Sequence, residues 1–261
     1  MERSTVPRFE ELSITEPEEV RTFLRKLPLS VDEERFTRFV LGFPHRYLAA
    51  TSPVEIVKHY ALMGSLGGRA VISSLSREGP LWKMCLVARD RSFLFARIAG
   101  SLGCFGMNIV AAEAFTNANA LVLDTFSFAD RAARFADEGE RRRFQAFLED
   151  VVEGKEDLEK ALRERTEIAE APGPALAFEW DDDAHPAASR LSVEGRDRLG
   201  LLHLISQHLS EAGCSIEMAV IQTPGERVRD EFYLTERGGK VSADTKRGIG
   251  AALGRLGQAE G

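Results

Sequence analysis

Apolar residues in the first third of the chain recur at the three- and four-residue spacing of amphipathic helices. Two capping-box patterns, Ser30 with Glu33 and Ser52 with Glu55, mark helix starts, and Pro53 suits the first position of the second helix. Glycines follow these apolar stripes, where helices commonly end. The pattern therefore predicts helices over 16–26, 30–42 and 52–64.

From about residue 81 short strands alternate with helices, and the chain repeats itself. At an offset of 107 residues, the triplet Arg89, Asp90 and Arg91 falls on Arg196, Asp197 and Arg198. The same offset places further residues on identical ones in the second copy: Leu94, Ile98, Leu102, Gly106, Ile109, Ala112 and Thr116. With one residue removed from a hairpin, Asp124 and Phe126 fall on Asp230 and Phe232. So many matches at one spacing indicate a duplicated module.

Both copies predict the same elements: a strand (81–88, 188–194), a charged turn and helix, two strands (108–116 and 121–128, 215–223 and 227–235) and a helix (140–152, 244–256). A charged helix over 155–170 and an apolar run over 175–180 follow the first copy. We expect that run to be the fourth strand of the first copy. The second copy shows no such strand before residue 261, which predicts an uncovered sheet edge.

The order βαββαβ, with helices on one face of an antiparallel sheet, is ferredoxin-like. The sequence thus predicts an α+β protein with two such modules in tandem, preceded by a short helical segment. The expected boundaries are 1–79 for the helical segment, 80–183 for the first module, with its extra helix before the last strand, and 184–261 for the second.

The charge pattern argues against several classes of protein. There are 34 Lys and Arg against 41 Asp and Glu, a net charge of −7, and no basic block of the kind that binds nucleic acid. No apolar run reaches the roughly 20 residues that cross a bilayer, and the N-terminus lacks a signal-peptide pattern. We expect a cytoplasmic location, no nucleic-acid partner and no membrane contact.

Metal, disulfide and nucleotide sites are also disfavoured. The three cysteines are scattered among apolar or small residues, which predicts buried thiols, and the five histidines lack partners at ligand spacing. No phosphate-binding glycine motif is present, so we expect no cofactor. The acidic run over 181–183 either attracts a divalent cation or forms a solvated linker between the modules, and its surroundings favour the linker.

The turn that holds Asp90, or Asp197 in the second copy, combines two features that suit an amino acid. A strand entering a helix exposes backbone N–H groups that attract a carboxylate, and the aspartate can accept a hydrogen bond from an ammonium group. The alternative is that each aspartate simply caps its helix, as Asp at such positions usually does.

The segments over 88–128 and 196–236 resemble ACT domains, whose signature is an Asp-Arg-Pro-Gly-Leu turn, a helix, a glycine and an Asn-Ile strand. More narrowly, Thr-Pro-Gly-Glu-Arg-Val-Arg-Asp-Glu-Phe-Tyr over 223–233 resembles the second ACT domain of bacterial PII uridylyltransferase/uridylyl-removing enzymes. Phe-Pro-His-Arg-Tyr over 43–47 resembles the helical segment that leads into these domains. The resemblance covers roughly residues 35–261.

This resemblance implies a regulator that binds glutamine and sets the balance between two catalytic activities. The catalytic parts themselves are missing from the sequence. There is no Gly-Ser-x-x-x-Gly segment followed by an Asp-x-Asp pair, and no His-Asp dyad, to bind the metals of those activities. We therefore expect no enzyme activity.

The ligand-binding positions that the turn and the resemblance indicate lie in both copies: Asp90, Leu94, Asn108 and Ile109, then Asp197, Leu199, Gly200, Leu201, Ser215 and Ile216. Neither copy has the complete pattern. Phe93 replaces the turn glycine in the first copy and is expected to crowd that site, whereas Ser215 replaces the strand asparagine in the second. One complete composite site can still draw on Asn108 and Gly200.

Two functions remain open at this stage. The first is an amino-acid-sensing regulator, with glutamine as the first candidate ligand. The second is a protein-interaction or scaffold module whose ligand sites are degenerate and which acts with a separate enzyme. Expected partners are a regulated enzyme or a PII-type signalling protein. A homodimer is also expected, because ACT modules commonly assemble edge to edge.

Overall fold

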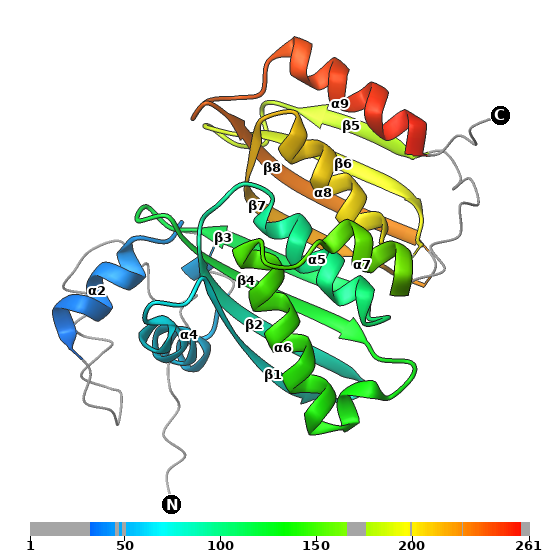
Figure 1. Ribbon diagram of the computed structural model, residues 1–261. Coiled ribbons are helices and arrows are strands. Elements are labelled where there is room, and N and C mark those ends of the chain that lie inside the picture. The colour runs from blue at the N-terminus through cyan, green and yellow to red at the C-terminus, as the bar shows by residue number, and fades with distance from the viewer. Residues whose placement is uncertain are drawn as a thin grey trace, which may run out of the picture.

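The computed structural model describes residues 32–44, 47–48, 51–165, 176–198, 200–225 and 227–256. The strands in these residues are β1 (Val71–Glu78), β2 (Leu81–Arg89), β3 (Asn108–Thr116), β4 (Leu121–Ala129), β5 (Ala177–Asp181), β6 (Ser189–Arg196), β7 (Cys214–Gln222) and β8 (Arg227–Glu236). They form one antiparallel sheet in the order β1-β2-β4-β3-β7-β8-β6-β5 (Figure 1). The two modules are therefore joined edge to edge within a single sheet.

The module helices lie across one face of this sheet (Figure 1). They are α5 (Leu94–Cys104), α6 (Glu138–Glu153) and α7 (Leu158–Arg165) in the first module, and α8 (Leu201–Glu211) and α9 (Ala243–Leu256) in the second, with a short 3₁₀ turn, η2 (Arg134–Ala136), before α6. Apolar residues of alternate strand positions and of the helix stripes form a continuous core between the two layers. The predicted α+β class with two ferredoxin-like modules is confirmed.

The strand beside β2 corrects the predicted chain order. β1 pairs with β2 along its whole length, from Val71 with Ala88 to Glu78 with Leu81, although only helices were expected before residue 80. A ferredoxin-like sheet needs a fourth strand at this position, and here it comes before the first strand of the repeat. Periodicity missed it because β1 is serine-rich and, apart from Val71, only partly buried or exposed.

The apolar run that was expected to close the first module lies in the second. β5 pairs with β6, with Trp180 opposite Leu191, and occupies the place corresponding to β1. Each module therefore has the chain order ββαββα instead of βαββαβ, and the edge expected to be uncovered in the second module is occupied by β5. A hydrophobic pattern identifies a strand but does not say which neighbour it pairs with.

The seam between the modules is formed by β3 and β7 on the sheet and by α5 and α8 above it. Glu113 pairs with Val220, its own counterpart in the repeat, so the two modules are related by an approximate two-fold axis at this pair. On the helix layer, Nδ1 of the buried His203 donates to the carbonyl of Ala96, again its counterpart, at 2.8 Å. Gly100 leaves the space that the imidazole fills, because a Cβ there would lie 2.8 Å from Nδ1.

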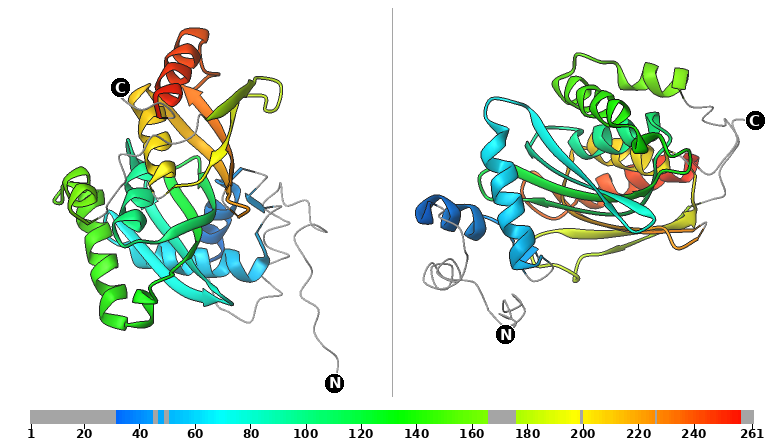
Figure 2. Two further views of the ribbon diagram at one scale, coloured as in Figure 1. Left: turned by 90° about the vertical axis from the view of Figure 1, so that its right-hand side faces the viewer. Right: turned by 90° about the horizontal axis from the view of Figure 1, so that it is seen from below.

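The N-terminal helices α2 (Glu33–Leu41) and α4 (Pro53–Leu66) pack on the opposite face of the sheet (Figures 1 and 2). Their apolar side chains belong to one buried cluster with Phe115 and Leu123 of the first module and Met218 and Tyr233 of the second. Helix α4 lies against β1 and β2, and the cluster continues from there across the seam. None of the helices in the part of the chain described here combines the length and apolar character needed to span a bilayer.

The ends of the N-terminal helices partly follow the prediction. Asp32 caps α2 through the N–H of Arg35 at 2.9 Å, so the expected cap at Ser30 is wrong, and Ser30 itself and the helix expected over 16–26 lie outside the described residues. The capping box of Ser52 and Glu55 is present at the start of α4. The helix continues past Gly64 to Leu66 and is followed by Gly67 with a positive φ of 54°, because one open glycine weakens a helix without ending it.

Candidate functional site

The two charged turns enter their helices in the same unusual conformation. Phe93 and Gly200, which correspond in the repeat, both have left-handed backbones, with φ of 64° and 81°. Neither helix has a side-chain N-cap. The alternative that Asp90 and Asp197 cap the helices is therefore wrong, and the first-turn N–H groups of α5 and α8 lack a capping side chain.

The arginine after each aspartate anchors the turn to the far end of its module. Arg91 donates from Nη1 to the carbonyl of Val152 at 3.0 Å, in the last turn of α6, and Arg198 donates from Nη2 to the carbonyl of Leu256 at 3.2 Å, at the end of α9. A cation at a helix C-terminus is favoured by the unpaired carbonyls and by the helix dipole. In each Arg-Asp-Arg triplet, the arginine after the aspartate thus has a structural role, and the aspartate is the candidate binding residue.

The approximate two-fold axis places the turn of each module beside the start of a strand in the other. The first recess, with a volume of about 360 Å³, lies between the turn at Asp90 and Phe93 and the start of β7 at Ser215 and Glu217. The second recess lies between the turn at Gly200 and the start of β3, and its volume is only about 30 Å³. Small-molecule sites have volumes of roughly 300 Å³ or more, so of these two recesses, as the described residues form them, the first has room for a ligand and the second does not.

The candidate residues divide between the two recesses. Asp90, Leu94, Ser215 and Ile216 line the first, and Asn108, Ile109, Asp197, Gly200 and Leu201 line the second. Leu199 lies outside the described residues. The structure therefore brings Asn108 and Gly200 together in one composite lining, as the sequence suggested. The expected crowding is reversed, because the recess beside Phe93 is open and the one beside Gly200 is nearly filled.

A buried aspartate from the middle of a strand lines each recess, and neither was among the candidate residues. Asp124 on β4 is 1% exposed, and Asp230 on β8 is 2% exposed. They are counterparts in the repeat, where their match served only as evidence of duplication. The signal that could have found them is a carboxylate at a strand position between apolar residues of the core face, such as Val122 and Phe126.

The two buried carboxyls differ in their hydrogen bonding. Neither oxygen of Asp124 accepts a hydrogen bond from a described residue, although the nearby N–H of Phe115 favours the ionised form. Burial, with a further contribution from Asp90, raises the pKa of Asp124 well above its usual range. Asp230 accepts from the N–H of Gln222 at 3.4 Å, and burial and the nearby Asp197 raise its pKa to about 7.

Asp197 itself is half-buried at the rim of the second recess. Burial raises its pKa, while the backbone of Arg198, the charge of Arg131 and the side-chain amide of Asn108 act in the opposite direction. The contact with Asn108 crosses the seam, from β3 of the first module to the turn of the second. Two polar side chains that line the second recess, one from each module, thus already contact each other.

Among the described residues, His59, His203 and the cysteines have structural surroundings, whereas His208 pairs with Glu211 at 2.9 Å on α8, a carboxylate partner that the sequence analysis did not expect. Nδ1 of His59 lies 3.0 Å from the hydroxyl of Tyr47 behind the sheet, and burial lowers the pKa of this histidine to about 4. Burial raises the pKa of Cys85 to about 12 and that of Cys214 to about 11, so both thiols stay protonated at neutral pH. The described residues contain no group of His, Cys, Asp and Glu side chains arranged to bind a metal ion.

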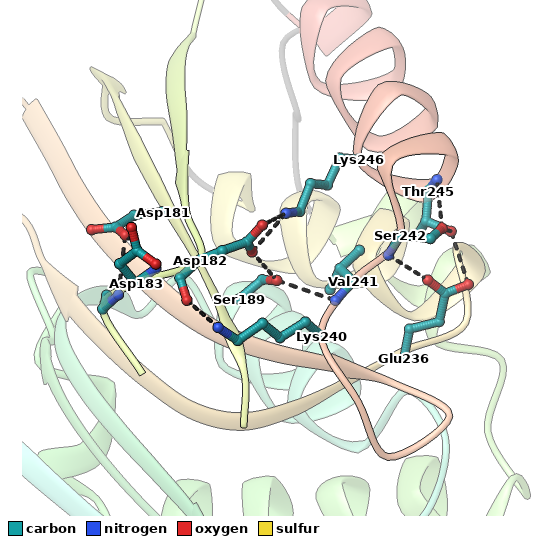
Figure 3. A network of polar contacts seen from close by, with 11 residues as sticks. Asp181, Asp182, Asp183, Ser189, Glu236, Lys240, Val241, Ser242, Thr245 and Lys246 are labelled. Carbon is teal, nitrogen blue, oxygen red and sulfur yellow. Dashed lines mark hydrogen bonds and ion pairs between the residues drawn. The ribbon is translucent and has the colours of Figure 1, made fainter. Parts of the chain in front are cut away.

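The acidic run over 181–183 forms the hairpin between β5 and β6, so the expected linker between modules is wrong (Figure 3). The Asp182 carboxylate accepts hydrogen bonds from the hydroxyl of Ser189 and from the ammonium group of Lys246 on α9. Asp181 accepts from the N–H groups of residues 183 and 184 and pairs with Arg190 at 2.8 Å. The run thus ties the hairpin to α9.

Comparison with known proteins supports the resemblance seen in the sequence. No protein-family model matches the chain. It is 33% identical over 173 residues to the bifunctional uridylyltransferase/uridylyl-removing enzyme of Bradyrhizobium diazoefficiens, which covers 63% of this chain and 18% of that enzyme. The predicted resemblance is confirmed. The enzymes of the same name from Caulobacter vibrioides and Azospirillum brasilense are 33% and 30% identical, covering 80% and 83% of this chain.

The match is to part of these enzymes only. The chain spans 18% to 24% of the length of the relatives just named. Among solved structures, the crystal structure of aspartate kinase from Synechocystis matches with 16% identity and a TM-score of 0.33, over 66% of this chain and 26% of that chain. At that score the overlap is too limited to indicate a shared function or assembly.

Proposed function

We propose that the chain is a non-catalytic regulator that binds a small amino acid, with glutamine as the first candidate, between its two modules. The observation that carries the proposal is the first recess, which has the volume of a ligand site and draws its lining from both modules. The similarity to a part of bifunctional uridylyltransferase/uridylyl-removing enzymes supports a regulatory role. The choice of glutamine as the first candidate ligand rests on that resemblance alone.

The lining of the first recess suits the head group of an amino acid. The first-turn N–H groups of α5 lack a capping side chain and favour a carboxylate, because they sit at the positive end of the helix dipole. Asp90, on the same turn, offers an acceptor for the ammonium group. One turn thus offers groups of opposite charge or polarity to both the carboxylate and the ammonium group of an amino acid.

A ligand between the modules also has a means of regulating the chain. The recess is bounded by α5 of one module and by the start of β7 of the other, so an occupied recess bridges the seam. A ligand that binds one arrangement of the modules better than another shifts the population toward it. The proposed output partner is a regulated enzyme or a PII-type signalling protein.

Thermal unfolding of the chain with each of the twenty amino acids tests this function. A ligand present at about a hundred times its Kd stabilises the folded state by about 2.7 kcal/mol, so we expect at least one amino acid, glutamine first, to raise Tm by several degrees at millimolar concentration. Isothermal titration calorimetry of that amino acid then gives the stoichiometry, which we expect to be one per chain. The absence of a shift with all twenty would refute amino-acid binding.

The second candidate function is a scaffold that has lost its ligands, and the nearly filled second recess favours it. In that case the chain binds a regulated enzyme or a second copy of itself with the same affinity whether or not amino acids are present. Light scattering coupled to size-exclusion chromatography, with and without 10 mM glutamine, separates the two functions. A sensor is expected to change its association or its unfolding with the amino acid, and a scaffold is not.

A further inference from the structure

We propose that Asp124 binds the protonated amine of the ligand in the first recess together with Asp90, an assignment that rests on the proposed function. The carboxyl group lies at the floor of the recess, on the central part of β4, between the turn at Asp90 and the start of β7. It faces the helix layer, as do Val122 and Phe126 two residues to either side, while Leu123 faces the N-terminal helices.

A carboxyl at this place is unfavourable for the protein alone. Asp124 is 1% exposed, and neither of its buried oxygens accepts a hydrogen bond of ordinary geometry from a described residue, although the N–H of Phe115 lies nearby. Buried polar groups in proteins almost always have partners, and an unpaired one lowers stability by roughly 1 to 3 kcal/mol. A ligand that brings a hydrogen-bond donor into the recess removes this penalty. Ligand binding therefore gives Asp124 a role, whereas packing of the protein alone does not account for a carboxyl group at this position.

The charges around the recess favour a cationic donor. Asp90 and Glu217 line the recess together with Asp124, and the guanidinium of Arg91 is directed to the carbonyl of Val152. The thiol of Cys214 in the same lining is uncharged at neutral pH, since burial raises its pKa. Three carboxyl groups and one engaged arginine give an acidic recess. An ammonium group satisfies Asp124 both as a hydrogen-bond donor and as a charge.

The equivalent position in the second module provides an internal contrast. Asp230 has a backbone donor in Gln222, and its recess of about 30 Å³ has room for no more than a water molecule or two. The N–H of Phe115, which is the counterpart of Gln222 in the repeat, likewise favours the ionised form of Asp124. The two aspartates are therefore distinguished mainly by the space beside them, which is large enough for a ligand only at Asp124.

Binding through Asp124 also moves a proton. Burial and the nearby Asp90 raise the pKa of Asp124, so the empty recess favours the neutral acid. Besides Asp90, Glu217 and Arg91, the titratable Cys85 on β2 contributes to this environment. When the ammonium group binds, the carboxyl ionises and its proton passes to the buffer, while the ammonium keeps its own. Release of a proton when the amino acid binds is the signature of this pairing.

The test compares the full chain with its Asp124→Asn and Asp230→Asn variants. Asn has the shape of Asp and no charge, so both variants are expected to fold, and circular dichroism checks this. The probes are the twenty amino acids, L-glutamine first, and the N-acetyl derivative of each one that binds. Thermal shifts rank them, and calorimetry at pH 7 in buffers of different ionisation enthalpy measures affinity and proton release.

We expect Asp124→Asn to weaken binding at least tenfold and to abolish proton release, Asp230→Asn to change affinity less than twofold, and N-acetyl derivatives not to bind. Unchanged affinity in Asp124→Asn, or equal binding of the N-acetyl derivative, would overturn the assignment while leaving the proposed function standing. A larger loss in Asp230→Asn than in Asp124→Asn would place the ligand in the second recess and overturn it too. If the unmodified chain binds none of the twenty, the proposed function fails, and the role of Asp124 fails with it.

Discussion

At the scale of single residues, the duplicated modules have kept their buried aspartates and changed what surrounds them. Asp124 and Asp230 occupy the same position in the repeat, yet one lines an open recess and the other lines a nearly filled one. The turn residues differ in the same way, with Phe93 where the second copy has Gly200. The open recess is therefore a property of packing, which residue identity alone does not reveal.

The raised pKa of Asp230 predicts a pH dependence of stability. Its pKa is about 7 in the folded chain against 3.8 for an ordinary aspartate, so between these values the folded state binds the extra proton and stability falls as pH rises. The loss is complete above pH 7 and amounts to a few kcal/mol. Asp230→Asn removes it, because the amide oxygen can still accept from Gln222. We expect the variant to match the unmodified chain at pH 4 and to be the more stable at pH 8.

Urea unfolding at pH 4 and pH 8 measures this difference. Asp244→Asn is the matched control, because that side chain is exposed on α9 and its ion pair with Arg247 is solvent-exposed, so its effect should stay within about 0.5 kcal/mol at either pH. A variant-to-parent difference in unfolding free energy that is the same at both pH values would show that Asp230 does not titrate in this range.

At the scale of elements, the close packing of α5 against α8 at the seam depends on a glycine. On α5, a Cβ at Gly100 would lie 2.8 Å from His203 and 2.8 Å from Leu158, inside the contact that joins the modules. The hydrogen bond from His203 to the carbonyl of Ala96 crosses the same contact. Close approach of α5 and α8 therefore rests on a small residue at one point of the interface.

Gly100→Ala is expected to lower the unfolding free energy by about 1 to 3 kcal/mol, since the added methyl group forces His203 or Leu158 to move within a packed interface. Gly64→Ala is the matched control on α4, where a Cβ meets nothing within 4 Å, and it is expected to stabilise by about 0.5 to 1 kcal/mol. Chemical denaturation of both variants measures these changes in unfolding free energy. Equal and small effects from the two would mean that the seam is not closely packed at Gly100.

The sequence predicted elements better than it predicted their partners. The repeat located β2, α5, β3, β4 and α6 and their copies, because each has its own apolar periodicity and its own glycine or turn. It missed β1 and misassigned β5, because pairing depends on which strand edge lies nearby in space. The candidate residues include lining residues of both recesses. The hydrophobic pattern did not predict that Asp124 lines a recess or that the two recesses differ in volume, because both depend on how the modules pack at the seam.

At the scale of the whole molecule, a single sheet is covered on both faces. The module helices cover one face, and α2 and α4 cover part of the other (Figure 2). Tyr47, which lies between these two helices in the chain, is buried with its ring centroid 5.4 Å from that of Phe115 on β3. The N-terminal segment is thus an integral layer of the fold, and its buried cluster extends into both modules.

Removing residues 1–68 is expected to expose this apolar face and to destabilise the pairing of the modules. Large contiguous apolar patches are rare on stable monomers, so the shortened chain should self-associate and bind a hydrophobic dye, and its Tm should fall by several degrees. Light scattering, dye fluorescence and circular dichroism measure these effects. A monomeric shortened chain with an unchanged Tm would show that the modules need no third layer.

The seam between β3 and β7 has a consequence for how the two recesses can differ. When identical chains pair through a two-fold axis, every pocket at their interface appears twice with the same residues. Here one polypeptide contains both halves of the interface. A difference between the copies, such as Phe93 in place of the turn glycine, therefore changes one pocket and leaves the other unchanged. The chain is in effect a fused heterodimer, and its pairing is independent of its concentration in the cell. One recess can then report on a small molecule while the other serves only to hold the halves together.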